Sequence, residues 1–75
     1  MNSTRLKFEV DDLYCIHYGN SIKDVRISRI EGDYIEYSLD ILGTYAEHSV
    51  NFENRIIRKI GKVKRFLGFP ISITP

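Results

Sequence analysis

The chain has 75 residues, enough for one domain near the lower size at which a core is stable without a metal, disulfide or partner chain, so a large buried active-site cavity is not expected. Hydrophobic residues at 43% and charged residues at 28% exclude a disordered chain, and the single cysteine excludes an intrachain disulfide. The net charge of +1 conceals an asymmetry, because residues 1–54 hold 5 basic and 10 acidic side chains, whereas residues 55–75 hold 6 basic and no acidic ones.

The first two predicted elements are strands. Leu6, Phe8 and Val10 alternate with charged residues, which predicts a strand over 5–10. A second strand is expected over 13–18, where apolar residues occupy both faces and a glycine-asparagine pair follows.

The clearest signal is a β-hairpin around a central glycine. Six apolar residues recur at every second position: Val25, Ile27, Ile35, Tyr37, Leu39 and Ile41. We expect residues 31–33 to form the loop, so that Ile30 lies opposite Tyr34. The same register sets Ile27 opposite Tyr37. One face of the hairpin is then apolar and the other polar, as expected for a half-buried antiparallel sheet.

The hydrophobic period changes after a fifth predicted strand over 45–50. At 100° per residue, the apolar side chains of residues 52–67 fall on one arc and most basic side chains on the other, which predicts a basic amphipathic helix. The alternative is a short helical turn at 52–60, capped by Gly61, followed by a last strand at 62–67.

These elements predict a mainly β fold of the α+β class in a single domain, 1–75. We expect a curled antiparallel sheet or small SH3-like barrel of about five short strands, with a C-terminal basic amphipathic helix or helical turn. Residues 68–75 are expected to form an extended apolar tail, because their prolines do not fit a helix. Over residues 13–67 the strand order, with a helical turn before a last strand, resembles SH3-like small barrels of the Tudor or Sm kind. The resemblance implies a fold and no residue roles.

The sequence offers little for catalysis or metal binding. Cys15 and His17, with Glu47 and His48, are the only residues that suggest such a site, and they lack the paired spacing of structural zinc ligands. The acidic pairs lie in predicted turns, and the glycines are isolated, so no phosphate loop is present. We therefore predict a protein that is not an enzyme and has no metal or cofactor.

Basic and tyrosine side chains are the candidate binding residues. The basic candidates are Arg55, Arg58, Lys59, Lys62 and Arg65. They suit the phosphates of a nucleic acid backbone, an acidic protein or a membrane surface. The alternative is that they face the acidic hairpin or are simply solvated. The tyrosine candidates are Tyr14, Tyr18 and Tyr34, because tyrosine buries a large area in protein contacts at small entropic cost.

The C-terminal tail is a candidate for self-association. Phe69, Ile71 and Ile73 recur at every second position and predict an apolar strand that pairs with an open sheet edge of a second copy, giving a homodimer. The rival is a tail that folds back over its own barrel as a plug.

The sequence thus predicts a non-catalytic protein-interaction module, such as an intracellular regulator, inhibitor or assembly subunit. The alternative is a sequence-nonspecific nucleic-acid-binding module that uses residues 55–65. A polar run follows Met1 in place of a signal-peptide core, and no apolar run approaches the roughly 20 residues of a membrane span, so a cytoplasmic location is expected.

Overall fold

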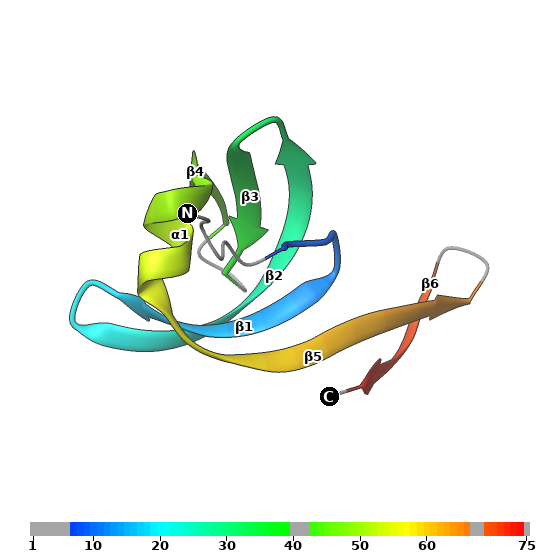
Figure 1. Ribbon diagram of the computed structural model, residues 1–75. Coiled ribbons are helices and arrows are strands. Elements are labelled where there is room, and N and C mark those ends of the chain that lie inside the picture. The colour runs from blue at the N-terminus through cyan, green and yellow to red at the C-terminus, as the bar shows by residue number, and fades with distance from the viewer. Residues whose placement is uncertain (1–6, 40–42, 67–68, 75) are drawn as a thin grey trace.

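The computed structural model describes residues 7–39, 43–66 and 69–74, and the side chains among them as far as residue 64. In this part of the chain, six strands and one short helix form. They are β1 (Asp12–Tyr18), β2 (Ser21–Glu31), β3 (Tyr34–Ser38), β4 (Thr44–His48), α1 (Ser49–Arg55), β5 (Ile56–Phe66) and β6 (Phe69–Thr74), as Figure 1 shows.

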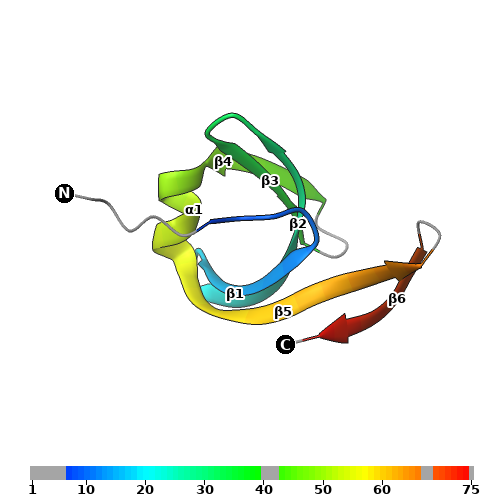
Figure 2. The ribbon, with the colours of Figure 1, turned by 45° about the vertical axis from the view of Figure 1, so that its right-hand side comes forward.

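The strands form a single antiparallel sheet in the order β4-β3-β2-β1-β5-β6. Strands β1 to β4 curl around a common interior that α1 covers on one side (Figure 2). β4 and β6 are the two ends of this order, so the sheet is not closed. The prediction of a mainly β fold built on an antiparallel sheet is confirmed, and the described residues contain one short helix.

Eight buried side chains make up the core of the described residues: Tyr14, Ile16, Val25, Ile27, Ile35, Tyr37, Leu39 and Phe52. The apolar face predicted for the hairpin is therefore confirmed from Val25 to Leu39, and Ile41 lies outside the described residues. α1 contributes Phe52, whose ring centroid lies 4.8 Å from that of Tyr37.

Both hairpin turns of the first three strands use a glycine with positive φ. Gly19 (φ 62°) follows β1 and Gly32 (φ 60°) follows β2, each as the first residue of a two-residue connection. This is the position where type II′ turns need glycine, and these turns match the twist of the paired strands.

The predicted three-residue loop at 31–33 is therefore wrong. Glu31 pairs with Tyr34, and Ile30 lies opposite Ile35. A bulge between Ile27 and Arg29 then shifts the register by one residue. It restores the predicted pairing of Ile27 with Tyr37, so the apolar face stays inside.

The predicted strand over 5–10 is not present in its described part. The chain bends at residues 9–12, where the backbone N–H of Glu9 donates to Oδ2 of Asp12 (2.9 Å) and that of Asp12 donates to the Glu9 carbonyl (3.1 Å). Asp11 adopts φ 77°. Residues 7–11 thus cross one end of the curled sheet as a strap (Figure 2), and Phe8 packs against the core.

The predicted basic helix over 52–67 is wrong, and the alternative with a short helical turn is nearer. The helix spans only Ser49–Arg55, begins inside the strand predicted at 45–50, and has His48 as its N-cap. β5 then begins at Ile56, well before the predicted residue 62. The β-branched residues after Arg55 favour a strand, and pairing with β1 satisfies their backbone groups.

The tail expected to be extended forms β6 over residues 69–74, which turns back and pairs with β5. This hairpin projects away from α1 and β4 in both views (Figures 1 and 2). β6 therefore lies along β5 of the same chain. The plug alternative required the tail to lie over the interior of the sheet, and β6 does not.

Candidate functional site

The basic residues of segment 55–65 do not share one face, because most of the segment is a strand. Lys59 and Lys62 point to the inner side of the sheet, where they meet the strap. Arg58 pairs in register with Cys15 and is exposed. Arg65 belongs to β5, but its side chain lies outside the described residues.

Lys59 and Lys62 are engaged with carboxylates of the strap and β1. Lys59 Nζ lies 3.4 Å from Oδ1 of the fully buried Asp12, and Lys62 Nζ lies 4.0 Å from the same oxygen. Lys62 also forms an ion pair with Glu9. The hydrogen bond from Lys62 lowers the pKa of Glu9 and raises the pKa of Lys62. These two lysines therefore hold the strap in place.

Tyr14 is a core residue and offers no contact surface. Its side chain is 3% exposed, its ring packs against Phe8 and Phe52, and Lys59 Nζ lies 6.0 Å from the ring centroid. Burial, followed by the charge of Asp12, raises the pKa of Tyr14 to about 12. The prediction that Tyr14 projects outward for binding is wrong.

Tyr18 and Arg55, in contrast, come together in what we call the tyrosine–arginine cluster: Tyr18, Tyr37, Tyr45, Glu47 and Arg55. The Arg55 guanidinium carbon lies 6.0 Å from the Tyr18 ring centroid. Arg55 Nε donates to Oε2 of Glu47 (2.7 Å), and the Tyr37 hydroxyl donates to the same oxygen (3.0 Å). The Tyr18 and Tyr45 rings meet edge to face, 5.5 Å apart.

This cluster joins elements that are not neighbours in the sheet. Tyr18 ends β1, Tyr45 and Glu47 belong to β4, and Arg55 ends α1. Side-chain contacts of the cluster therefore connect β4 with β1 and α1, although β4 and β1 do not pair through their main chains. The hydrogen bond to Glu47 raises the pKa of Arg55, and burial, followed by the bond to Glu47, raises the pKa of Tyr37.

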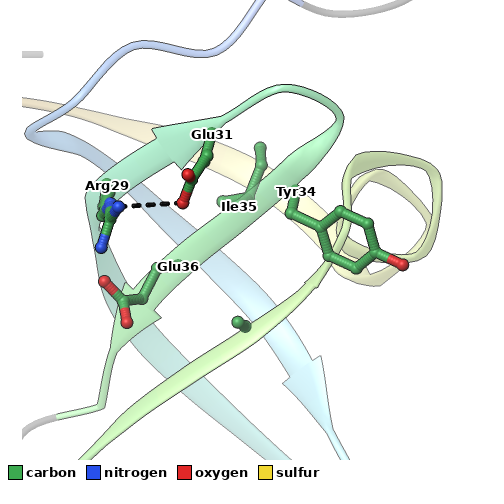
Figure 3. A pocket seen from close by; sticks show the side chains of 6 residues that line it. Arg29, Glu31, Tyr34, Ile35 and Glu36 are labelled. Atoms are coloured by element: carbon green, nitrogen blue, oxygen red, sulfur yellow. Dashed lines mark ion pairs between the residues drawn. The ribbon is translucent and has the colours of Figure 1, made fainter.

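A second feature, the β4 groove, is a depression of about 80 Å³ on the outer side of β2, β3 and β4 (Figure 3). Its lining consists of Arg29, Glu31, Tyr34, Ile35, Glu36 and Ala46. Tyr34 is 56% exposed, with its ring edge to face with that of His48, at 5.5 Å. Arg29 and Glu31 form an exposed ion pair of 2.9 Å. Among the described residues, the Glu36 carboxylate has no ion-pair partner.

Most residues of the groove and of the cluster were not among the sequence candidates for binding. Tyr45, Ala46 and Glu36 gain their place only through the pairing of β3 with β4, which sets Glu36 opposite Ala46 and Tyr37 opposite Tyr45. Alternation marked Glu36 as outward-facing, but no sequence signal identified its neighbours.

The histidines and the cysteine do not converge. His17 lies on β1 and His48 on β4, and these strands do not pair. Within residues 7–39, 43–66 and 69–74, no group of three histidine, cysteine or acidic side chains is placed to hold a metal ion.

No protein-family model matches this chain, and neither a curated protein nor a solved structure matches it. In the described part of the chain, no helix is both long enough and apolar enough to cross a membrane.

Proposed function

We propose that this protein is a non-catalytic protein-interaction module that binds an extended segment of a partner at the β4 edge. The observation that carries the proposal is the open edge of β4 beside the β4 groove. Among the described strands, none pairs with the outer side of β4. Such an edge presents unpaired N–H and C=O groups, and an added strand satisfies them by main-chain hydrogen bonds.

The groove supports a preference for a basic partner segment. Its charged lining consists of Arg29, Glu31 and Glu36, and the exposed ion pair leaves Glu36 as the uncompensated charge. The exposed ring of Tyr34 adds an aromatic surface that attracts cations. Ala46 on β4 is small and exposed, which leaves room for a partner side chain beside the edge. A lysine or arginine of an added strand fits these three features.

Two synthetic peptides test this proposal. An acetylated ten-residue peptide of alternating lysine and threonine is expected to shift the backbone NMR signals of Thr44–His48, and a glutamate–threonine peptide is not. Glu36→Lys and Tyr34→Ala should each weaken binding of the basic peptide. Asp24→Lys is the matched control, because Asp24 is exposed on β2 and does not line the groove.

If Glu36→Lys and Asp24→Lys weaken binding equally, the peptide responds only to the net charge of the protein, and the groove is not its site. An absence of shifts at β4 with either peptide would reject strand addition at this edge.

Exposed cations favour the second candidate, a sequence-nonspecific nucleic-acid-binding module. Arg58 and Lys64 are exposed, and Arg58 has no ion-pair partner among the described residues. Against it, Lys59 and Lys62 are engaged with carboxylates of the same chain. Retention on heparin or nucleic acid should then be weak and should fall steeply with salt.

The triple change Arg58→Gln, Lys59→Gln and Lys62→Gln should abolish any such retention. Retention that persists in the triple variant would reject this segment as the site, and an absence of retention at low salt would remove the second candidate.

We further infer that the curled part of the sheet is a small SH3-like barrel. The order β4-β3-β2-β1-β5, with a helix immediately before β5, supports this inference. Many unrelated functions use such barrels, so the fold itself adds nothing to the choice of function.

A further inference from the structure

Arg55 is held in one orientation by two neighbours. Glu47 accepts its Nε–H at 2.7 Å, and the ring of Tyr18 lies under the guanidinium at 6.0 Å. Glu47 is itself fixed by the Tyr37 hydroxyl, and its side chain is only 14% exposed. An arginine held this way loses little freedom when it binds a ligand.

The other end of the guanidinium remains available. Glu47 takes the Nε–H, and no described residue accepts a hydrogen bond from Nη1 or Nη2. The Arg55 side chain is 37% exposed, so a ligand at the surface of the domain can reach it. Two parallel N–H groups at this edge match two oxygens of a carboxylate or a phosphate.

The surroundings of Arg55 suit an anion that carries an apolar or aromatic group. The Tyr18 ring lies against the guanidinium, and the Tyr45 ring meets that of Tyr18 edge to face. Neither tyrosine is fully buried. Lys23 pairs with Ile16, two residues before Tyr18 on β1, and the alternation with buried Val25 places it on the same inner side. It adds a second cation near this end of the sheet.

We propose that Arg55, with Tyr18 and Tyr45, forms a binding site for an oxyanion, a carboxylate or a phosphate group, attached to an aromatic or apolar body. The site lies at the end of the sheet where β1 turns into β2 and α1 joins β5 (Figure 1). It does not depend on the β4 groove, whose lining shares no residue with it. The two proposals can therefore fail separately.

Titration of the full chain with four probes tests the site. Inorganic phosphate, acetate, phenyl phosphate and benzoate are added at constant ionic strength, with chloride as the reference anion, while the arginine side-chain ¹⁵N signals are followed by NMR. We expect the Nη signals of Arg55 to shift with phenyl phosphate or benzoate, and to shift less at the same concentration of phosphate or acetate. Tighter binding of phenyl phosphate would identify the oxyanion as a phosphate, and tighter binding of benzoate would identify it as a carboxylate.

Two variants separate a bidentate site from general attraction to charge. Arg55→Lys keeps the positive charge but loses the paired N–H groups, and should weaken the better aromatic probe by about tenfold. Arg58→Lys makes the same replacement at an exposed arginine of the same segment and should change binding by less than about twofold.

Equal effects of the two variants would overturn the proposal, as would the absence of any shift at Arg55 with all four probes. If Arg55→Lys does not fold, the Arg55 signals of the unmodified chain still decide the question. Tyr18→Leu then provides a second variant, which removes the ring under the guanidinium and should weaken binding of the better aromatic probe. Unchanged binding of that probe to Tyr18→Leu would overturn the proposal.

Discussion

Lys59 on β5 places its Nζ 3.4 Å from Oδ1 of Asp12, a carboxylate at the start of β1 that is fully buried. That oxygen accepts no hydrogen bond among the described residues, so the nearby ammonium groups of Lys59 and Lys62 are its main compensation. The same carboxylate accepts the N–H of Glu9 and shapes the bend of the strap. One ion pair thus links β5, β1 and the N-terminal strap.

A double-mutant cycle measures this link. Lys59→Gln should lower the free energy of unfolding by about 1–2 kcal/mol, because a buried carboxylate loses one of its two cations. In an Asp12→Asn background the same change should cost less than about 0.5 kcal/mol. Urea denaturation provides the four values. Arg58→Gln is the control and should have little effect, because Arg58 is exposed. If the effects of Lys59→Gln and Asp12→Asn on the free energy of unfolding are additive, Lys59 and Asp12 do not interact.

The Phe52 ring is the main contact of α1 with the core, where it meets Phe8, Tyr14 and Tyr37. Phe52→Ala should lower the free energy of unfolding by about 3–5 kcal/mol. That is a large part of the total for a domain of this size, so partial unfolding is expected at 37 °C. Thermal denaturation checks this, with Val50→Ala on the exposed side of α1 as the control. Similar losses in both variants would show that Phe52 is not central.

Stability should fall at alkaline pH because of Tyr14. Burial raises its pKa from an ordinary value of 10.0 to about 12 in the folded state. The folded chain therefore keeps this proton where the unfolded chain has lost it, so the contribution is fully present below pH 10 and is lost as pH rises towards 12. The loss is on the order of 2 kcal/mol. Urea denaturation between pH 8 and 12 should show this decline, and Tyr14→Phe should reduce it. If stability declines equally in Tyr14→Phe, other groups cause the decline, and Tyr37, whose pKa is also raised, is the first to test.

Self-association through the tail residues Phe69, Ile71 and Ile73 remains a prediction. β6 is the other end of the sheet order, so an extended segment of a second copy has an edge to pair with there. We expect light scattering to show a dimer for the full chain and a monomer for a chain that ends at Gly68. A monomer in both cases would reject this prediction, and a dimer in both would place the contact elsewhere.

Hydrophobic alternation was sufficient to identify the central hairpin. Val25, Ile27, Ile35 and Tyr37 are buried as the period of two requires, although the turn has two residues and not three. The bulge after Ile27 absorbs this difference, because burying the apolar face stabilises the chain more than a regular ladder does. Local pattern and tertiary packing agree here.

The same reasoning failed at both ends of the chain. Residues 56–66 satisfy a helical wheel, but they pair with β1 as a strand, and a wheel takes no account of the edge that β1 offers. The alternation of Phe8 with charged residues is real, yet the bend at Asp12 turns the segment into a strap that crosses the core. In both cases partners distant in sequence decided the local structure.

By itself the sequence determined the mainly β class, the inner face of the hairpin and the separation of acidic from basic residues, because these follow from composition and from a period of two. Only the tertiary structure decided which charged side chains pair within the chain and which remain available to a ligand. It set Lys59 and Lys62 against carboxylates far away in sequence and brought Tyr18, Tyr45 and Arg55 together from three elements. Contacts of this kind depend on strand order and register, which alternation within one strand does not encode.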